Sequence, residues 1–366
     1  MITIENAYNT AVVYAEEIDS GAEGLIRALC GSPLSAGCSI RIMPDVHAGR
    51  GCAVGTTMTL TDKAAPGLVG VDIGCGMSVY KIRSKKTELQ KLDKLVHNCI
   101  PAGRSVRRKA HRFAENTDLD SLQCGHHVQK DKALCSIGTL GGGNHFIELD
   151  KGADGSYWLI IHSGSRRLGA EVAGFYQKEA FADAPEGIPY EFAYAKGALL
   201  RDYLHDMRIT QDFAELNRRA MASELVKAMK WDVEDYFSCV HNYIDVERML
   251  LRKGAVSAQR GERVLVPLNM RDGCLLCVGK GNPDWNYSAP HGAGRLLSRT
   301  EAKQSFTVSQ YKKEMAGIYS TSVSRETLDE SPMAYKPAAS ILSQIAPTLE
   351  ITERLLPVYN FKAGEE

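Results

Sequence analysis

The segment Gly70–Met77, with the sequence GVDIGCGM, constrains this chain more than any other stretch. It places a carboxylate, Asp72, and a thiol, Cys75, three residues apart among three glycines. Glycine permits tight or left-handed backbone and lets a ligand approach closely. A carboxylate oxygen and a thiolate sulfur at this spacing can bind one metal ion. A structural turn explains the segment equally well when it is taken alone, so the rest of the sequence has to decide between the two.

The composition is that of a soluble globular protein. Of 366 residues, 44% are apolar and 24% are charged, which allows a sizeable buried core. The 44 basic residues balance 44 acidic ones, so any nucleic-acid site has to be a local patch. No stretch approaches the roughly 20 apolar residues of a membrane span, and the N-terminal segment lacks a signal-peptide pattern. Ten cysteines in such a chain favour free thiols and metal ligands over disulfides, and we expect a cytoplasmic protein with no membrane partner.

The order of patterns predicts one large α+β domain over residues 1–366. Glycine clusters alternate with short runs typical of strands, such as 158–161 and 264–266. A helical insertion is expected at about 188–253, where apolar residues recur at helical spacing and indicate two or more helices. Residues 88–98 and 341–356 also have a helical pattern. No clean strand–helix–strand repeat is present, so a Rossmann sheet is not favoured.

Histidine is the best guide to a metal site because the chain has only ten. A lone histidine is more often a core or surface residue than a ligand. Several histidines in glycine-rich or strand-end settings change that balance, although His241 is expected on or near a helix. One set supplies enough ligands for two divalent ions with a bridging thiolate: Asp72, Cys75, His145, His162 and His241. The mixed oxygen, nitrogen and sulfur donors suit Mn²⁺, Zn²⁺ or Fe²⁺ better than Mg²⁺ or Ca²⁺.

Other cysteines and histidines have simpler interpretations. Cys274 and Cys277 form a C-x-x-C pair that resembles half a zinc site, but no second pair stands at suitable spacing. Buried thiols near a strand are the favoured interpretation of this pair. Three histidines in charged helical contexts are expected at the surface: His97, His111 and His205.

His291 stands in a setting that suits phosphate chemistry. The small residues Gly292 and Gly294 follow it and leave room for a phosphate, and Arg295 and Arg299 would share one face if a helix begins here. Arginine matches phosphate oxygens in bidentate geometry, and an imidazole nitrogen can attack an activated phosphorus. Asp45, from Met43-Pro44-Asp45-Val46-His47, is a candidate to hold this imidazole in one tautomer. A capped helix N-terminus is the structural alternative.

Taken together, the motifs resemble the RtcB family of GTP- and manganese-dependent RNA ligases. The matching blocks occur in order over most of the chain: MPDVHAGRG (43–51), GVDIGCGM (70–77), GTLGGGNHFIEL (138–149), HSGSRRLG (162–169), HNY (241–243), GKGN (279–282), APHGAGRLLSR (289–299) and DESPMAYKP (329–337). The resemblance implies an RtcB-type fold, with mixed and antiparallel sheets around a central metal site.

The resemblance also implies roles for individual residues. One Mn²⁺ would be bound by Asp72, Cys75 and His145, and the second by Cys75, His162 and His241. His291, with Asp45, would be catalytic and would carry GMP from GTP as a covalent intermediate. Arg166 and Arg299 would bind RNA phosphates. Guanylate contacts would come from Asn144, His145, Glu148, His241, Asn242, Asn269, His291, Gly292, Gly294, Arg295, Tyr335 and Lys362.

The implied reaction joins RNA 3′-phosphate or 2′,3′-cyclic phosphate ends to 5′-hydroxyl ends, in RNA repair or tRNA splicing. An accessory activating or RNA-repair protein is a further implied partner. Two other functions remain open: a metal-dependent RNA end-processing phosphoesterase that does not ligate, and an RNA-binding module without catalysis. The module is disfavoured because binding alone does not need Cys75 beside three histidines.

Four positions depart from the family pattern. Leu268 and Asn269 stand where glycine and serine are usual, Cys274 replaces a common serine, and Arg167 replaces a glycine. These changes leave the metal ligands and His291 intact, and they bear on nucleotide affinity and RNA specificity. They suggest a divergent, shorter paralogue used in RNA repair.

Overall fold

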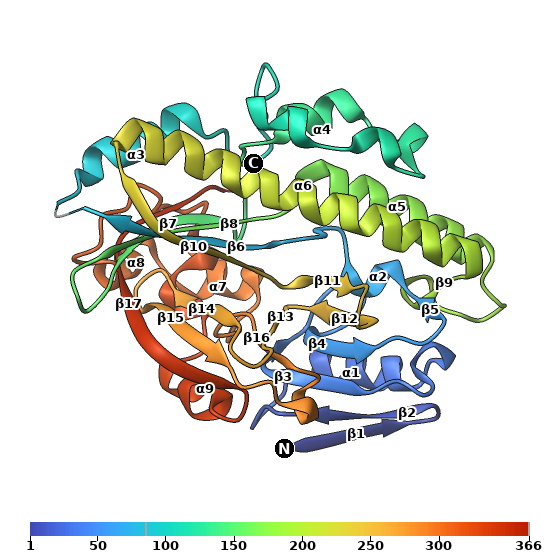
Figure 1. Cartoon of the computed structure of the whole chain (residues 1–366). Coiled ribbons are helices and arrows are strands. Elements are labelled where there is room, and N and C mark those ends of the chain that lie inside the picture. The colour runs from blue at the N-terminus through green and yellow to red at the C-terminus, as the bar shows by residue number, and fades with distance from the viewer. Residues whose placement is uncertain (85, 365–366) are drawn as a thin grey trace.

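Two large sheets organise the protein in the computed structural model, which describes residues 1–84 and 86–364 (Figure 1). The first sheet has the order β1 (Ile2–Asn6), β2 (Asn9–Val13), β3 (Ile40–His47), β4 (Val54–Thr59), β12 (Leu250–Lys253) and β11 (Asn242–Asp245). It is mixed, because β2 and β3 are parallel and the other neighbours are antiparallel.

The second sheet is antiparallel throughout its described residues. Its order is β10 (Asp232–Val240), β6 (Gly76–Arg83), β8 (Tyr157–Ser163), β7 (Phe146–Lys151), β17 (Leu349–Lys362), β15 (Gly273–Gly279) and β14 (Arg263–Asn269). Two short pairs accompany the large sheets: β13 (Ala255–Ser257) with β16 (Ser288–Pro290), and β5 (Lys63–Ala64) with β9 (Ala195–Lys196).

Helices flank both sheets, and one group of them covers one face of the second sheet. The helices are α1 (Ser20–Cys30), α2 (Pro66–Val69), α3 (Leu89–Cys99), α4 (Lys130–Ser136), α5 (Arg166–Ala182), α6 (Gly197–Met229), α7 (Arg299–Ser305), α8 (Val308–Glu314) and α9 (Ala338–Ile345). In Figure 1 the long helix α6 crosses above β6 and β8, with α3 and α5 beside it. No helix in the described part of the chain combines the length and apolar character that a membrane crossing requires. The predicted α+β class is confirmed.

The second sheet has two different faces because side chains alternate along each strand. On β7, Ile147 and Leu149 pack in the apolar layer shared with α3 and α6. Phe146, Glu148 and Asp150 occupy the alternate positions and point to the opposite face, called the inner face below. The inner face therefore carries two carboxyl groups of β7 within a buried setting.

Strand β17 connects the two halves of this sheet. Its residues 349–355 pair with β15, and its residues 356–362 pair with β7. Register shifts near Pro357 mark irregular pairing, and Figure 1 shows β17 as a long curved strand. The curvature turns the inner faces of β7 and β15 toward a common interior, where Cys274 of β15 meets the carboxyl groups of β7.

The prediction of two or more helices over 188–253 is wrong, because a single α-helix covers about half of that range and strands follow it. One helix, α6, occupies 197–229, and it ends where Lys230 adopts a left-handed conformation with φ of 56°. Residues 232–253 form the strands β10, β11 and β12, and His241 lies between β10 and β11 rather than on a helix. Pairing of β10 with β6, far away in sequence, overrides the local helical composition.

Other predicted elements have mixed outcomes. The helix at 88–98 and the strands around 158–161 and 264–266 are confirmed by α3, β8 and β14. The helix at 341–356 is wrong beyond Ile345, because β17 begins at Leu349. His111 is buried, with Nε2 3.0 Å from Glu224, whereas His97 and His205 are exposed as predicted. The single domain over 1–366 stays a prediction.

Candidate metal and nucleotide site

The five predicted metal ligands converge on the Cys75 sulfur. Cys75 Sγ lies 3.4 Å from His145 Nε2 and 3.3 Å from His162 Nε2. His145 Nε2 lies 3.0 Å from Asp72 Oδ2, and the Nε2 atoms of His162 and His241 are 3.2 Å apart. Two groups of possible ligands result, each with its donor atoms within 4.8 Å of one another: Asp72, Cys75 and His145, and Cys75, His162 and His241. Cys75 belongs to both.

Strand order explains why residues so far apart in sequence meet. The neighbouring strands β10, β6, β8 and β7 begin or end at one edge of the second sheet. There His162 of β8 stands opposite both Met77 and Phe146, while Val240 of β10 stands opposite Gly76. The ligands at these strand ends and in the adjoining loops are therefore brought together.

Two glycines permit the close approach of the segments. A Cβ added at Gly76 would lie 2.4 Å from the Cys239 carbonyl oxygen. A Cβ at Gly164 would lie 2.1 Å from Asp72 Oδ1. Both distances are far inside van der Waals contact, so only glycine allows these backbones to pass beside the ligands.

Two side chains of helix α6 fix the positions of the three loops that carry the ligands, near residues 74, 138 and 164. Arg218 is fully buried and donates to the carbonyl oxygens of Gly74 and Ser163, each at 2.9 Å. Asn217 accepts from the Gly138 amide at 2.8 Å and donates to the Gly164 carbonyl at 3.0 Å. Sequence reasoning missed both residues, because nothing in an ordinary helical stretch marks them as partners of distant loops.

The electrostatics of this cluster fit a bound cation. Burial lowers the pKa of His162 and His241 well below the usual range, so both imidazoles are neutral. His162 Nδ1 donates to the Asn144 carbonyl oxygen at 3.2 Å, which leaves its Nε2 lone pair facing Cys75. Burial and the Asp72 charge raise the pKa of Cys75, and a metal ion would reverse that effect. The donor set therefore fits a divalent ion.

His291 lies next to this cluster and in contact with Asp45. Its ring centroid is 4.9 Å from that of His241. Its Nδ1 lies 2.6 Å from Asp45 Oδ2, and its backbone N–H donates to the same oxygen at 3.2 Å. Asp45, on β3, is fully buried. The predicted contact between the two residues is therefore present, and in the neutral tautomer that donates Nδ1–H to Asp45 the lone pair lies on Nε2.

The loop around His291 is not helical, so Arg295 and Arg299 do not share a helix face. Residues 291–298 are irregular and α7 begins only at Arg299. Gly294 has φ of 77°, and a Cβ there would lie 2.6 Å from the Asp45 carbonyl oxygen. Ser298 caps α7 with a reciprocal Glu301 contact. The loop is thus packed tightly against β3, which places His291 beside Asp45.

A cavity of about 900 Å³ opens in front of His291. Most residues of the predicted site line it: Asn144, Glu148, His162, His241, Asn269, His291, Gly292, Gly294, Arg295, Arg299, Tyr335 and Lys362. His145 faces Cys75 instead. Asn242 accepts from the Gly254 amide at 2.9 Å and stands outside the cavity lining. Arg166 also lies outside it, donating to the Gly103 carbonyl at 2.7 Å.

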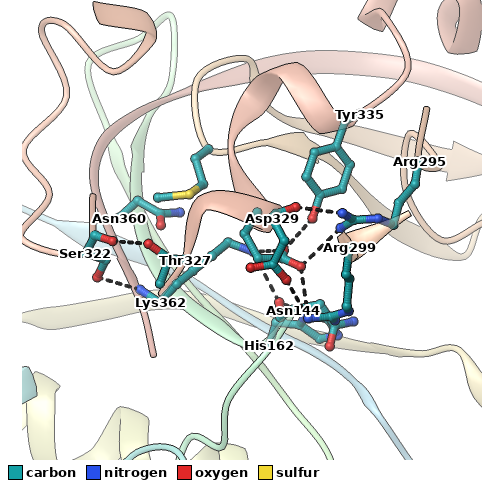
Figure 2. Close-up of polar contacts among 12 residues, drawn as sticks. Asn144, His162, Arg295, Arg299, Ser322, Thr327, Asp329, Tyr335, Asn360 and Lys362 are labelled. Carbon is teal, nitrogen blue, oxygen red and sulfur yellow. Dashed lines mark hydrogen bonds and ion pairs between the residues drawn. The ribbon is translucent and has the colours of Figure 1, made fainter. Parts of the chain in front are cut away.

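Two buried acids, which the sequence analysis did not single out, organise the basic side of the cavity. Glu330 accepts from Arg295 at 3.1 Å, from Lys362 at 2.8 Å and from the Tyr335 hydroxyl. Asp329 accepts from Arg299 at 3.0 Å. Figure 2 shows Arg295, Arg299, Tyr335 and Lys362 gathered around this acidic pair. Burial raises the pKa of Glu330, but Lys362, Arg299 and Arg295 outweigh it and lower that pKa to about 2.

A second acidic group lies at the floor of the cavity. Glu148 accepts a hydrogen bond from Asn360 Nδ2 and another from the Cys274 thiol, with 3.4 Å between Sγ and Oε1. Asp150, on the same face of β7, lies beside them, and these donor atoms of Glu148, Asp150 and Cys274 lie within 4.8 Å of one another. The predicted burial of Cys274 and Cys277 near a strand is confirmed by their place on β15. Asp150 was not identified from the sequence.

Comparisons with known proteins find relatives over most of this chain. The model of a family described as tRNA-splicing ligase RtcB matches residues 33–363. An RNA-splicing ligase RtcB from Escherichia coli K12 is 31% identical, over 87% of this chain and 88% of that protein. tRNA-splicing ligases RtcB from Aeropyrum pernix and Archaeoglobus fulgidus are 28% and 26% identical, over 81% and 87% of this chain and 81% and 86% of their own lengths.

Proposed function

This chain belongs to the RtcB family of tRNA-splicing ligases, and from that premise we propose that it is a GTP-dependent RNA ligase. It would join RNA 3′-phosphate or 2′,3′-cyclic phosphate ends to 5′-hydroxyl ends through a covalent histidine–GMP intermediate. The observation that carries the proposal is the position of His291. Its imidazole is oriented by Asp45, opens on a large cavity and lies beside a cluster able to bind two ions.

The first step would be attack of His291 Nε2 on the α-phosphorus of GTP. The N–P bond forms as the bond to the β-phosphate oxygen breaks, and pyrophosphate leaves. Asp45 accepts the hydrogen bond from Nδ1–H, so the proton stays on the imidazole. Its carboxylate also stabilises the positive charge that develops on the ring. This orientation is the contribution of the chain's own residues to nucleophile activation.

Two Mn²⁺ ions are the proposed metals. Asp72, Cys75 and His145 would hold one ion, and Cys75, His162 and His241 would hold the other. Bound divalent ions neutralise phosphate charge, align in-line attack and lower the pKa of water. His162 is kept in the ligating tautomer by the Asn144 carbonyl, and Arg218 fixes the loops that carry Asp72 and His162.

The cavity lining is the proposed guanylate site. The proposed nucleotide contacts all line the cavity: Asn144, Glu148, Asn269, Arg295, Tyr335 and Lys362. Gly292 and Gly294 keep the space beside His291 open. Arg299, at the cavity rim, and Arg166, near Asp72, would bind RNA phosphates. Asn242 and His145 would support guanylate binding indirectly. Asn242 would do so by fixing the backbone at Gly254, and His145 by holding a metal ion.

The remaining steps would act on RNA. A 2′,3′-cyclic end is opened to a 3′-phosphate, GMP passes from His291 to that phosphate, and a 5′-hydroxyl then displaces GMP to join the strands. The proposed roles are RNA repair or tRNA splicing, with an accessory activating or repair protein as a further partner. The cytoplasm is the proposed compartment, since the ten cysteines are free thiols and suit a reducing environment.

The test is transfer of label from α-labelled GTP to the protein in the presence of Mn²⁺. We expect a labelled protein for the wild type and for the control His97→Ala, which alters an exposed histidine. We expect no label for His291→Ala. Absence of a His291-dependent adduct with every divalent metal would overturn the ligase proposal. Opening of cyclic phosphate ends without any adduct would instead support the phosphoesterase alternative.

A further inference from the structure

The acidic group at the cavity floor is formed by three side chains from two strands. Glu148 and Asp150 stand two residues apart on β7 and therefore share its inner face. Cys274 comes from β15, and β17 lies between these strands in the sheet. All three residues are buried, with at most 2% of their surface exposed. The curvature of the sheet, rather than sequence proximity, brings the thiol to the carboxyl groups.

Asp150 lacks the partners that a buried carboxyl group needs. Apart from Glu148 and Cys274 beside it, no described residue donates a hydrogen bond to either of its oxygens, although the side chain is fully buried. The Asn360 Oδ1 atom beside Glu148 is also buried without a partner. Buried polar groups are nearly always paired because leaving them unpaired costs several kcal/mol. Burial and the Glu148 charge raise the pKa of Asp150 well above its usual range.

Two occupants can satisfy such a group: a proton shared between the carboxyls, or a cation. Lys362 is near enough to influence Glu148, but its ammonium group is already paired with Glu330 at 2.8 Å. A shared proton would relieve repulsion between Glu148 and Asp150 and would leave the Cys274 thiol as a hydrogen-bond donor to Glu148. A metal ion would use all three donors.

The spacing of the donor atoms suits a single ion. Cys274 Sγ lies 3.4 Å from Glu148 Oε1, and all three donor atoms lie within 4.8 Å of one another. Tetrahedral zinc with sulfur and oxygen ligands places those ligands about 3.5 Å apart. One thiolate with two carboxylates is a donor set of intermediate softness, which suits zinc better than Mg²⁺ or Ca²⁺.

We propose that Glu148, Asp150 and Cys274 form a third metal site, of zinc type, separate from the Cys75 cluster. The ion would enter from the cavity, because Glu148 is part of its lining. Binding releases the thiol proton of Cys274 and any proton held between the two carboxyl groups. If Glu148 also binds the nucleotide, as proposed above, the ion and the guanylate share one carboxylate.

Metal stoichiometry of the full chain tests this site. With saturating Zn²⁺, elemental analysis after dialysis is expected to give about three ions per chain for the wild type and about two for Cys274→Ser. Cys277→Ser is the matched control, because Cys277 is a buried thiol of the same strand with no carboxyl partner. It should retain about three ions. Two ions in the wild type, or equal loss in both serine variants, would overturn the proposal.

The absorption spectrum of bound Co²⁺ tests the same site without counting the ions of the Cys75 cluster. In Cys75→Ser, bound Co²⁺ should still give a thiolate-to-cobalt charge-transfer band, and added Cys274→Ser should abolish it. Asp150→Asn preserves shape but removes a charged ligand, so it should weaken cobalt binding about 10-fold or more. A band that survives without Cys274 would contradict the assignment. Because none of these readouts uses GTP, they are decided separately from the ligase proposal.

Discussion

Two clusters of side chains contribute residues to the lining of the same cavity, but their polar groups find partners in opposite ways. The imidazole–thiol cluster consists of Asp72, Cys75, His145, His162 and His241. The Glu330 cluster consists of Asp329, Glu330, Arg295, Arg299, Tyr335 and Lys362. In the first, imidazole nitrogens and a thiol face one another at 3.2–3.4 Å. In the second, buried carboxylates pair with basic side chains at 2.8–3.1 Å. The first cluster needs a cation to complete it, whereas the second is complete as it stands.

The difference shows how the two halves of the site are prepared for phosphate chemistry. Imidazole nitrogens, a carboxylate and a thiol that converge in this way are a ligand set, and their geometry depends on the ion they bind. The cations of the second cluster are held in place by Glu330 before any nucleotide arrives, so less ordering is needed on binding.

Cys75→Ala should have the largest effect, because Cys75 belongs to both groups of possible ligands. Bound Mn²⁺ should fall from about two ions per chain to nearly none, and the GMP adduct should disappear. Elemental analysis and label transfer measure the two effects. Cys52→Ala is the control, since Cys52 is similarly buried but donates to the Leu68 carbonyl instead of facing the histidines. Full Mn²⁺ content in Cys75→Ala would disprove the shared ligand.

Asp45→Asn should leave both ions bound but slow adduct formation. An amide can donate to His291 Nδ1 and so favours the wrong tautomer, for which losses of about 10²- to 10⁴-fold are expected. Single-turnover labelling gives the rate, and metal analysis tests whether the neighbouring cluster is intact. The exposed Asp62→Asn serves as control. An unchanged rate would show that the 2.6 Å contact does not orient the nucleophile.

Glu330→Gln should destabilise the folded protein by about 3 kcal/mol, because it leaves buried cations without their counter-charge. Urea unfolding measures this loss. The exposed Glu326→Gln, four residues away, should change stability by less than about 0.5 kcal/mol. A small effect at Glu330 would mean that the Glu330 cluster is not complete in itself, and the comparison with the imidazole–thiol cluster would fail.

The stability difference between the wild type and Glu330→Gln should depend on pH. The pKa of Glu330 is lowered from 4.5 to about 2 in the folded protein. Such a group stabilises the fold above pH about 4.5, and that contribution is lost as pH falls toward 2. The difference in unfolding free energy should therefore be constant near neutral pH and begin to shrink below pH about 5. A difference that grows on acidification would contradict the ion pairs.

The sequence allowed the chemistry of the site to be predicted better than its architecture. Cys75 and three histidines stood out because cysteine and histidine are rare in this chain, and Asp72 stood out because it lies beside Cys75 among glycines. Asp150 and Glu330 did not, since acidic residues are common and only burial beside particular partners makes them unusual. The strand at 232–240 was missed for a related reason, because its pairing partner β6 lies about 150 residues earlier.

The sequence by itself determined which atoms are available: a thiol, imidazoles, carboxyl groups and guanidinium groups beside flexible glycine backbone. Only the tertiary structure decided which of them share a centre, because proximity depends on strand order, the register of β10, β6, β8 and β7, and the curvature of β17. It also decided their protonation, since the pKa of Cys75, Asp150 and Glu330 depends on burial and on charges contributed by distant segments.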